Sequence, residues 1–293
     1  MIEAPKPGLY RDVPSEVYHS WDAVSASLLA DLRRFPPAQV RWNMLHPSAP
    51  TPAMRFGSAL HAALLEPDTF DERYVRAPDV DRRTKAGKEA WAAVEAEGRT
   101  VLSFDDMIRI DGMRSAAMAH PIVRRLLEGV GVNEASLVWQ DPIHDLPCKL
   151  RVDRLVQLDG RSFVIDFKST ADVSPAAFSR TIENLAYHIR AAWYLRGLRE
   201  VATAEREYLW IAQDKGEPYL PAVYQIDPDD LAEGAGDCAR LLAFYAHCRA
   251  SDVWPGYTED QAEICQRPRW ARRAPESEAD ETRGRETYDE GSW

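Results

Sequence analysis

The sequence predicts an α/β protein in which helices flank a mixed central sheet and a helical region forms the N-terminal part. Apolar residues recur at helical spacing in the first half of the chain, most clearly over 54–65 and 104–128. The middle of the chain changes to the apolar pattern of strands over 134–140, 147–158 and 162–168. This order of helices and strands is typical of one α/β domain with a mixed sheet.

Local signals define the other elements. Ser25 has the character of a helix cap, and the helix that it begins should stop before Pro36. A further helix is expected over 88–97, after a basic loop at 78–88. The C-terminal half should contain a helix over 175–198, a hairpin of strands 206–213 and 219–226 turning at Lys215-Gly216, and a helix over 228–249.

Composition limits the class of protein. The chain has 293 residues, of which 45% are hydrophobic, so wholesale disorder is excluded. Its net charge of −11 argues against a simple basic coat protein for nucleic acid.

We expect one domain over 1–257, with its core at about 54–257. An extension over 258–293 should be acidic and disordered from about 274, because acids dominate that segment.

Cysteine usage and hydropathy indicate the compartment. The four cysteines form no Cys-x-x-Cys pair, so neither a zinc ribbon nor a disulfide framework is indicated. No apolar stretch approaches the ~18 residues that span a bilayer. The first residues lack the apolar segment of a signal peptide. We therefore expect a soluble, cytoplasmic protein without a membrane partner.

Two carboxylates should meet in the central hairpin. Asp159-Gly160 favours a two-residue type I′ turn, which pairs Leu158 with Arg161. The same register places Asp153 directly opposite Asp166, with Cβ atoms ~4.5–5.5 Å apart. Strand alternation then puts Lys168 on the face of Asp166, with Arg151 opposite Lys168.

Opposed carboxylates repel unless a cation joins them, and oxygen ligands of this kind suit Mg²⁺ or Mn²⁺. Lys168 would then orient or deprotonate a water, or neutralise charge on a phosphate. The alternative is a surface hairpin whose acids pair with Arg151 and Lys168. Spacing alone leaves both interpretations open.

Other residues are candidates for the same site. His61 shares a helix face with Gly57, which permits close backbone approach beside the imidazole, although such a histidine is more often a core group. Glu134 begins the strand before that of Asp153, in a register that the intervening loop does not fix. Tyr187, Arg190 and Tyr194 share one helix face, either for phosphate or base contact or as an ordinary amphipathic helix.

These residues resemble a known family. His61, Asp153, Asp166-Phe167-Lys168 and Tyr187 to Tyr194 match, in order, the nuclease motifs of the RecB-like branch of the PD-(D/E)xK superfamily. More narrowly, the chain resembles the phage-type exodeoxyribonuclease VIII (RecE-like) exonucleases from about Tyr18 to Tyr257. The distinctive segments are 24–28, 56–61, 65–67, 83–88, 148–153 and 254–257. Each is weak alone, and their order and spacing make the resemblance specific.

The resemblance implies a restriction-endonuclease-like core and two-metal, Mg²⁺-dependent hydrolysis of DNA, with Mn²⁺ as a substitute. The metal ligands would be His61, Asp153, Asp166 and the carbonyl of Phe167, with Glu134 at an acidic position of the motif. Lys168 would help to activate the attacking water. No iron–sulfur cluster is expected, because the cysteines are too widely spaced for the tight run that binds one.

The resemblance also implies a substrate and partners. Similar proteins digest linear double-stranded DNA from the 5′ end, leave 3′ single-stranded tails for phage-type recombination, form homo-oligomeric rings and often work beside a single-strand annealing recombinase. The expected DNA-contacting residues are Arg82, Arg83, Lys85, Lys88, Arg151, Tyr187, Arg190 and Tyr194. One departure is Arg190, which stands where the family usually has Gln. A larger, donor-only side chain puts the usual hydrogen bond there in doubt.

The sequence argues against several other enzyme classes. Ala86-Gly87-Lys88-Glu89 lacks the first glycine and the Ser or Thr of a phosphate-binding loop, and neither a Gly-x-Ser-x-Gly nor a His-Glu-x-x-His motif occurs. The remaining alternatives are a structure-specific or single-strand nuclease of the same superfamily, or a non-catalytic protein that binds DNA ends.

Overall fold

The computed structural model describes residues 2–202, 204–268 and 271. The chain divides into two compact units, Met1–Gly256 and Tyr257–Trp293. In the second unit, residues 257–268 form turns and irregular backbone. The predicted acidic tail from about 274 lies outside the described residues.

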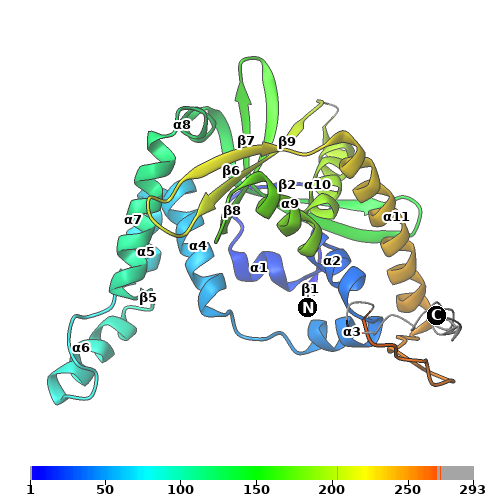
Figure 1. Cartoon of the computed structure of the whole chain (residues 1–293), viewed down its shortest axis with the longest axis horizontal. Coiled ribbons are helices and arrows are strands. Elements are labelled where there is room, and N and C mark those ends of the chain that lie inside the picture. The colour runs from blue at the N-terminus through cyan, green and yellow to red at the C-terminus, as the bar shows by residue number, and fades with distance from the viewer. Residues whose placement is uncertain (1, 203, 269–270, 272–293) are drawn as a thin grey trace, which may run out of the picture. The chain divides into compact units, whose positions relative to one another are not determined.

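The first unit is built on a mixed sheet with the strand order β10-β9-β8-β7-β6-β2 (Figure 1). Its strands are β2 (Gly8–Tyr10), β6 (Val130–Asp141), β7 (Leu146–Leu158), β8 (Arg161–Thr170), β9 (Glu207–Asp214) and β10 (Pro221–Gln225). Strands β8 and β9 pair in parallel, and the other neighbours pair antiparallel. The predicted α/β class with a mixed sheet is therefore confirmed.

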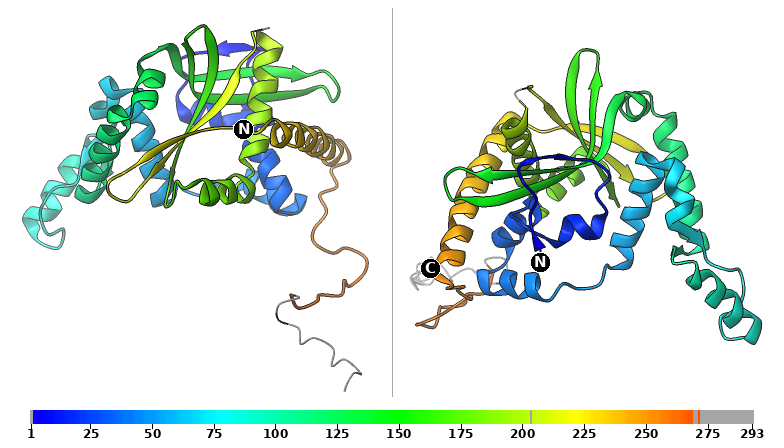
Figure 2. Two further views of the ribbon diagram at one scale, coloured as in Figure 1. Left: turned by 45° about the horizontal axis from the view of Figure 1, so that its top comes forward. Right: turned by 180° about the vertical axis from the view of Figure 1, so that it is seen from behind.

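Helices cover both faces of this sheet (Figure 2). On one face, Leu29, Trp193 and Leu241 share a core with the sheet. They belong to α2 (Ala26–Arg34), α10 (Tyr187–Val201) and α11 (Pro228–Ser251). On the other face, Leu60 and Met113 are buried in a second core, beneath α4 (Pro52–Leu65), α7 (Phe104–Ala119) and α8 (Pro121–Glu128).

Most predicted elements form, and two expected helices are each broken in two. The segment 104–128 divides at His120-Pro121 into α7 and α8, because proline ends a helix and favours the start of the next. The segment 175–198 divides into α9 (Pro175–Asn184) and α10, with Ala186 at φ 53° between them. The sequence patterns missed α3 (Pro37–Leu45), which begins directly after Pro36, the proline before which the preceding helix stops.

An arm projects from the sheet between α4 and α7 (Figures 1 and 2). It contains β4 (Tyr74–Arg76), α6 (Lys85–Ala96) and β5 (Thr100–Leu102), and β4 pairs in parallel with β5. The expected basic loop at 78–88 is shorter than predicted, because Thr84 caps α6 and accepts a hydrogen bond from the Gly87 amide. Lys85 and Lys88 therefore lie on the first turn of a helix.

The N-terminal segment is attached to β7 by a buried lysine. Lys149 is 6% exposed, and its Nζ donates hydrogen bonds to the carbonyl oxygens of Tyr18 and Trp21 at 3.0 and 2.7 Å.

The other short elements are β1 (Ile2–Glu3), α1 (Ser15–Ser20), β3 (Trp21–Asp22), the 3-10 helix η1 (Pro67–Thr69) and α5 (Phe70–Arg73). In the described part of the chain, no helix is long and apolar enough to cross a membrane.

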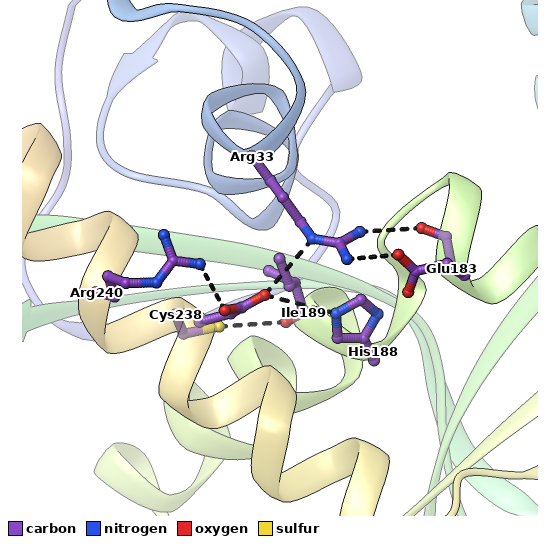
Figure 3. Close-up of polar contacts among 7 residues, drawn as sticks. Arg33, Glu183, His188, Ile189, Cys238 and Arg240 are labelled. Atoms are coloured by element: carbon purple, nitrogen blue, oxygen red, sulfur yellow. Dashed lines mark hydrogen bonds and ion pairs between the residues drawn. The ribbon is translucent and has the colours of Figure 1, made fainter. Parts of the chain in front are cut away.

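An ion-pair network joins the helices of the first face (Figure 3). The Asp237 carboxylate of α11 lies 2.7 Å from Arg240, 3.6 Å from Arg33 of α2 and 3.7 Å from His188 of α10. Arg33 also lies 2.6 Å from Glu183 of α9. Because the Asp237 side chain is 16% exposed, these pairs are only partly screened by water.

We predict that Asp237→Asn destabilises the protein. The substitution leaves two guanidinium groups and a buried histidine without their shared anion, which should cost about 1–3 kcal/mol in the free energy of unfolding. Denaturant unfolding measures the change. Glu233→Gln, at an exposed position of the same helix, is the matched control and should stay within about 0.5 kcal/mol. Equal stability of the two variants would contradict a role for the network.

Candidate metal centre

The candidate site lies at a break in the ladder between β6 and β7. Pairing runs in one register from Val130 opposite Gln157 to Asp141 opposite Leu146, and it skips Glu134 and Asp153. Glu134 has φ 49°, a left-handed conformation that a regular strand does not contain. The same register places these two acids opposite each other.

Both strands change their alternation at this break. Val132 and Ala135 both pack into the core of the α10 face, as do their partners Leu155 and Val152. Strict alternation would put residues three apart on opposite faces of the sheet. The break therefore adds an extra residue to each strand, as a bulge does, and takes the side chains of Glu134 and Asp153 out of the regular pattern.

Three ligand-bearing side chains gather at this point. His61, Glu134 and Asp153 each offer one atom, and these atoms lie within 4.8 Å of one another. His61 comes from α4, and its Nδ1 lies 3.6 Å from Asp153 Oδ2. The side chains are 25%, 27% and 14% exposed, so the cluster is sheltered and still reachable. Two carboxylates and an imidazole are a donor set that suits Mg²⁺ or Mn²⁺.

The electrostatics of the cluster favour a cation. Burial, and then the neighbouring Asp153 carboxylate, raise the pKa of Glu134 to about 8, although Arg151 opposes the shift. Arg151 Nε lies 3.8 Å from Glu134 Oε2 and donates a 3.0 Å hydrogen bond to Ser136. Without a metal, the repulsion between the two carboxylates therefore favours the protonated form of Glu134. A divalent cation would replace that proton.

The predicted pairing of Asp153 with Asp166 is corrected by the structure. The hairpin register is confirmed from Leu158 opposite Arg161 to Arg154 opposite Ile165, and the ladder ends there. Asp153 Oδ2 instead accepts a 2.7 Å hydrogen bond from the Phe167 amide. The reason is the break in β7, which removes Asp153 from the ladder. Asp166 is not a member of the three-residue cluster.

Asp166 is buried beside Lys168 on the α10 face. Its side chain is 1% exposed, and within the described chain neither of its oxygens accepts a hydrogen bond. Lys168 Nζ makes an ion pair with Oδ2 at 2.5 Å. A buried carboxylate with unused lone pairs is costly unless a cation completes its environment, so Asp166 also fits a metal-binding role.

The Phe167 carbonyl connects the two groups of residues. It accepts a 3.0 Å hydrogen bond from His61 Nε2 and a 3.3 Å hydrogen bond from Lys168 Nζ. Because successive side chains of β8 alternate, Asp166 and Lys168 lie on one face while the Phe167 ring packs on the other. The backbone of residues 166–168 therefore lies between His61 and the α10 face.

Helix α10 places tyrosines and an arginine next to Asp166. Arg190 Nη1 donates a 3.3 Å hydrogen bond to the Tyr194 hydroxyl, and Lys168 Nζ lies 5.4 Å from the centre of the Tyr187 ring. Burial opposes the charge of Arg190, yet Tyr194 and Asp166 hold its pKa above the usual value. Arg190 is thus a half-buried cation beside Tyr194, and the Asp166 charge stabilises it.

Sequence patterns missed Tyr208. This β9 residue is 1% exposed, its hydroxyl has no hydrogen-bond partner among the described residues, and burial followed by the Asp166 charge raises its pKa. Tyr208 pairs with Val164 in the parallel ladder. The register of a parallel pair is set by a crossover helix, so no local signal placed Tyr208 near the acids.

The other predicted DNA-contacting residues lie elsewhere. Arg82 pairs with Glu95 at 2.6 Å and stacks on Trp91, and Arg83 pairs with Asp81 at 3.0 Å. Lys85 and Lys88 are exposed on α6. These four residues belong to the arm, and Arg151 is held between Glu134, Ser136 and the Val13 carbonyl. The structure thus places Arg151 beside Glu134 of the acidic cluster, whereas the other four basic residues belong to the arm.

We predict that Asp153→Asn and Glu134→Gln each weaken Mn²⁺ binding by about tenfold or more, because each removes one anionic ligand. Isothermal titration calorimetry in the absence of DNA measures the affinity. Asp159→Asn is the matched control, since its carboxylate lies at the turn of the β7–β8 hairpin and pairs with Arg125. Wild-type affinity in both cluster variants would show that the metal is held elsewhere.

Comparisons with known proteins agree with this fold. The family model described as "PDDEXK-like domain of unknown function (DUF3799)" matches residues 25–268. A crystal structure described as a "Putative exonuclease" from Eubacterium rectale aligns with a TM-score of 0.59 at 10% identity, over 88% of this chain and 96% of that one. The structure of SSO0001 aligns at only 0.35, with 13% identity over 76% of each chain, which is too low to argue a shared fold. No curated protein matches the sequence. Because the family model covers most of the chain, the protein belongs to the PDDEXK-like DUF3799 family.

Proposed function

We propose that the protein is a metal-dependent exodeoxyribonuclease that digests linear double-stranded DNA from the 5′ end. The observation that carries the proposal is the meeting of His61, Glu134 and Asp153 beside the buried Asp166–Lys168 pair. Membership of a PDDEXK-like family supports nuclease chemistry. Polarity, 3′ tails, a ring and an annealing recombinase as partner rest on the resemblance to RecE-like enzymes.

The residues present fit a divalent cation. His61, Glu134 and Asp153 would hold one ion, and Asp166 with the Phe167 carbonyl would contribute beside it, because Asp166 has unused lone pairs. When bound, such an ion polarises a phosphate oxygen and lowers the pKa of a water. We propose Mg²⁺ as the natural ion, with Mn²⁺ as a substitute, because the site offers mainly hard oxygen ligands.

Lys168 would help to activate the attacking water. Its Nζ is held between the Asp166 carboxylate and the Phe167 carbonyl, at 2.5 and 3.3 Å, which fixes the direction of its donors. Hydrolysis joins the water oxygen to phosphorus and breaks one P–O bond. The attacking water loses one proton to solvent, and the leaving oxygen takes up one proton from solvent. Lys168 and Arg190 would stabilise the negative charge that develops on the phosphate.

Exposed basic residues on the arm would hold the DNA backbone. Lys85 and Lys88 project from the first turn of α6, where the helix dipole also favours an anion. Arg82 and Arg83 make ion pairs on the surface, which are weak enough for phosphate to compete. Contacts of this kind would make binding strongly dependent on salt.

A digestion assay tests the proposal. We expect Mg²⁺-dependent loss of the 5′ label from linear duplex DNA, with little action on nicked circles or single strands, and no reaction in EDTA. Preferential cleavage of single strands or branched DNA would instead indicate the other nucleases of the superfamily. Binding of DNA ends without cleavage, in either Mg²⁺ or Mn²⁺, would contradict an enzyme.

Asp166→Asn separates catalysis from folding. Because the substitution leaves Lys168 and Arg190 without their neighbouring anion, the metal-free protein should lose about 1–3 kcal/mol in the free energy of unfolding and still fold. Cleavage should fall by more than about a hundredfold, since a metal-facing charge is lost. Thermal unfolding in EDTA and the digestion rate measure the two effects. Wild-type cleavage by this variant would contradict the assignment of Asp166.

A further inference from the structure

A cavity of about 430 Å³ lies between α4, α7 and α8. Its walls are largely aliphatic and include Leu64 and Leu65 of α4, Met118 of α7 and Leu127 of α8. This volume lies in the range of about 300–1,000 Å³ that is typical of small-molecule sites. Nothing in the metal centre described above uses this space.

The cavity adjoins the metal centre. Asn133, which lines it, directly precedes Glu134, and Leu65 lies one helical turn beyond His61 in α4. The Asn133 amide donates a hydrogen bond to the Leu65 carbonyl, so these two walls are fixed to each other. A molecule in the cavity would therefore lie next to the ligands of the metal.

A buried cation lines the same cavity. Arg154 is 6% exposed, and it donates hydrogen bonds to the carbonyls of Leu126 and Gly129 and to Asn133 Oδ1. All three acceptors are neutral, and no carboxylate among the described residues lies within ion-pair distance of Arg154. A buried guanidinium with neutral partners favours a ligand that brings a negative charge or hydrogen-bond acceptors.

The rim of the cavity adds one positively and one negatively charged side chain. Arg114 of α7 lines it and is only loosely paired with Asp111, at 3.8 Å. The exposed Glu128 of α8 also lines it. The lining thus combines apolar walls with two guanidinium groups, an amide and one carboxylate. A flat heterocycle linked to a phosphate matches this combination.

We propose that this cavity receives the terminal nucleotide of the DNA strand, an inference that rests on the proposed function. The base would lie against the aliphatic walls, with Asn133 and Arg154 at its polar edge, and the phosphate would face Arg114. The cavity then acts as a subsite that positions the next phosphodiester bond at the neighbouring metal ligands.

The experiment fills the cavity from its rim. Ser115 lines the cavity and is exposed, and among the described residues its hydroxyl donates a hydrogen bond only to the Asp111 carbonyl of α7. Ser115→Trp therefore adds a large side chain at the cavity rim without replacing a buried residue. Ala119→Trp is the control, because this exposed residue of the same helix is outside the lining. The probe is deoxyadenosine monophosphate, titrated by calorimetry in EDTA so that it cannot bind through a metal.

Wild type and Ala119→Trp should bind the probe with similar affinity, and Ser115→Trp should bind it at least about tenfold more weakly, or by 1.4 kcal/mol. Inorganic phosphate should compete poorly, because it lacks the base. Undetectable binding to the wild type, equal binding by Ser115→Trp, or equal competition by phosphate would each overturn the proposal.

A second readout separates this subsite from the proposed function. The ratio of duplex cleavage to hydrolysis of bis(4-nitrophenyl) phosphate, which has no nucleobase, should fall at least about tenfold in Ser115→Trp and stay constant in Ala119→Trp. An unchanged ratio in Ser115→Trp would count against the subsite. A wild type that binds the nucleotide but hydrolyses neither substrate would refute the nuclease and leave the nucleotide site standing.

Discussion

The repulsion between Glu134 and Asp153 is the constraint on which the site depends. The two acids lie opposite each other where the β6–β7 ladder is interrupted, and their partial burial makes two adjacent negative charges costly. The protein keeps this arrangement by holding Glu134 in a left-handed conformation and by bonding Asp153 to the Phe167 amide. Strain and repulsion at one point are expected where a bound cation repays them.

The three residues that follow in β8 extend the site across the sheet. Asp166 and Lys168 face α10, while the carbonyl between them accepts the hydrogen bond from His61 of α4. Elements on both faces of the sheet thereby contribute to one centre. The cavity is lined by Asn133, which precedes Glu134 in β6, and by Leu65, which lies one turn beyond His61 in α4. The proposed metal ligands, the Lys168 side chain and the cavity are thus arranged around one sheet.

Sequence patterns predicted the features that local chemistry determines. The Ser25 cap, the Asp159-Gly160 turn and the register from Leu158 to Arg154 each follow from a few neighbouring residues. The resemblance to RecE-like nucleases, rather than local chemistry, implied that His61 and Asp153 belong to one site, and their side chains lie 3.6 Å apart. Local patterns did not reveal the break at Glu134, since a bulge shared by two strands has no signature in either strand alone. The position of Tyr208 and the pairing of β4 with β5 depend on tertiary contacts and were missed for the same reason.

The central claim is that His61, Glu134 and Asp153 hold a divalent cation. Crystals soaked in Mn²⁺ and measured at a wavelength where manganese scatters anomalously test it directly. The arrangement predicts an anomalous peak for one manganese ion that is coordinated by one atom from each of these three residues. A peak that is absent at saturating Mn²⁺, or one that excludes Asp153, would contradict the claim.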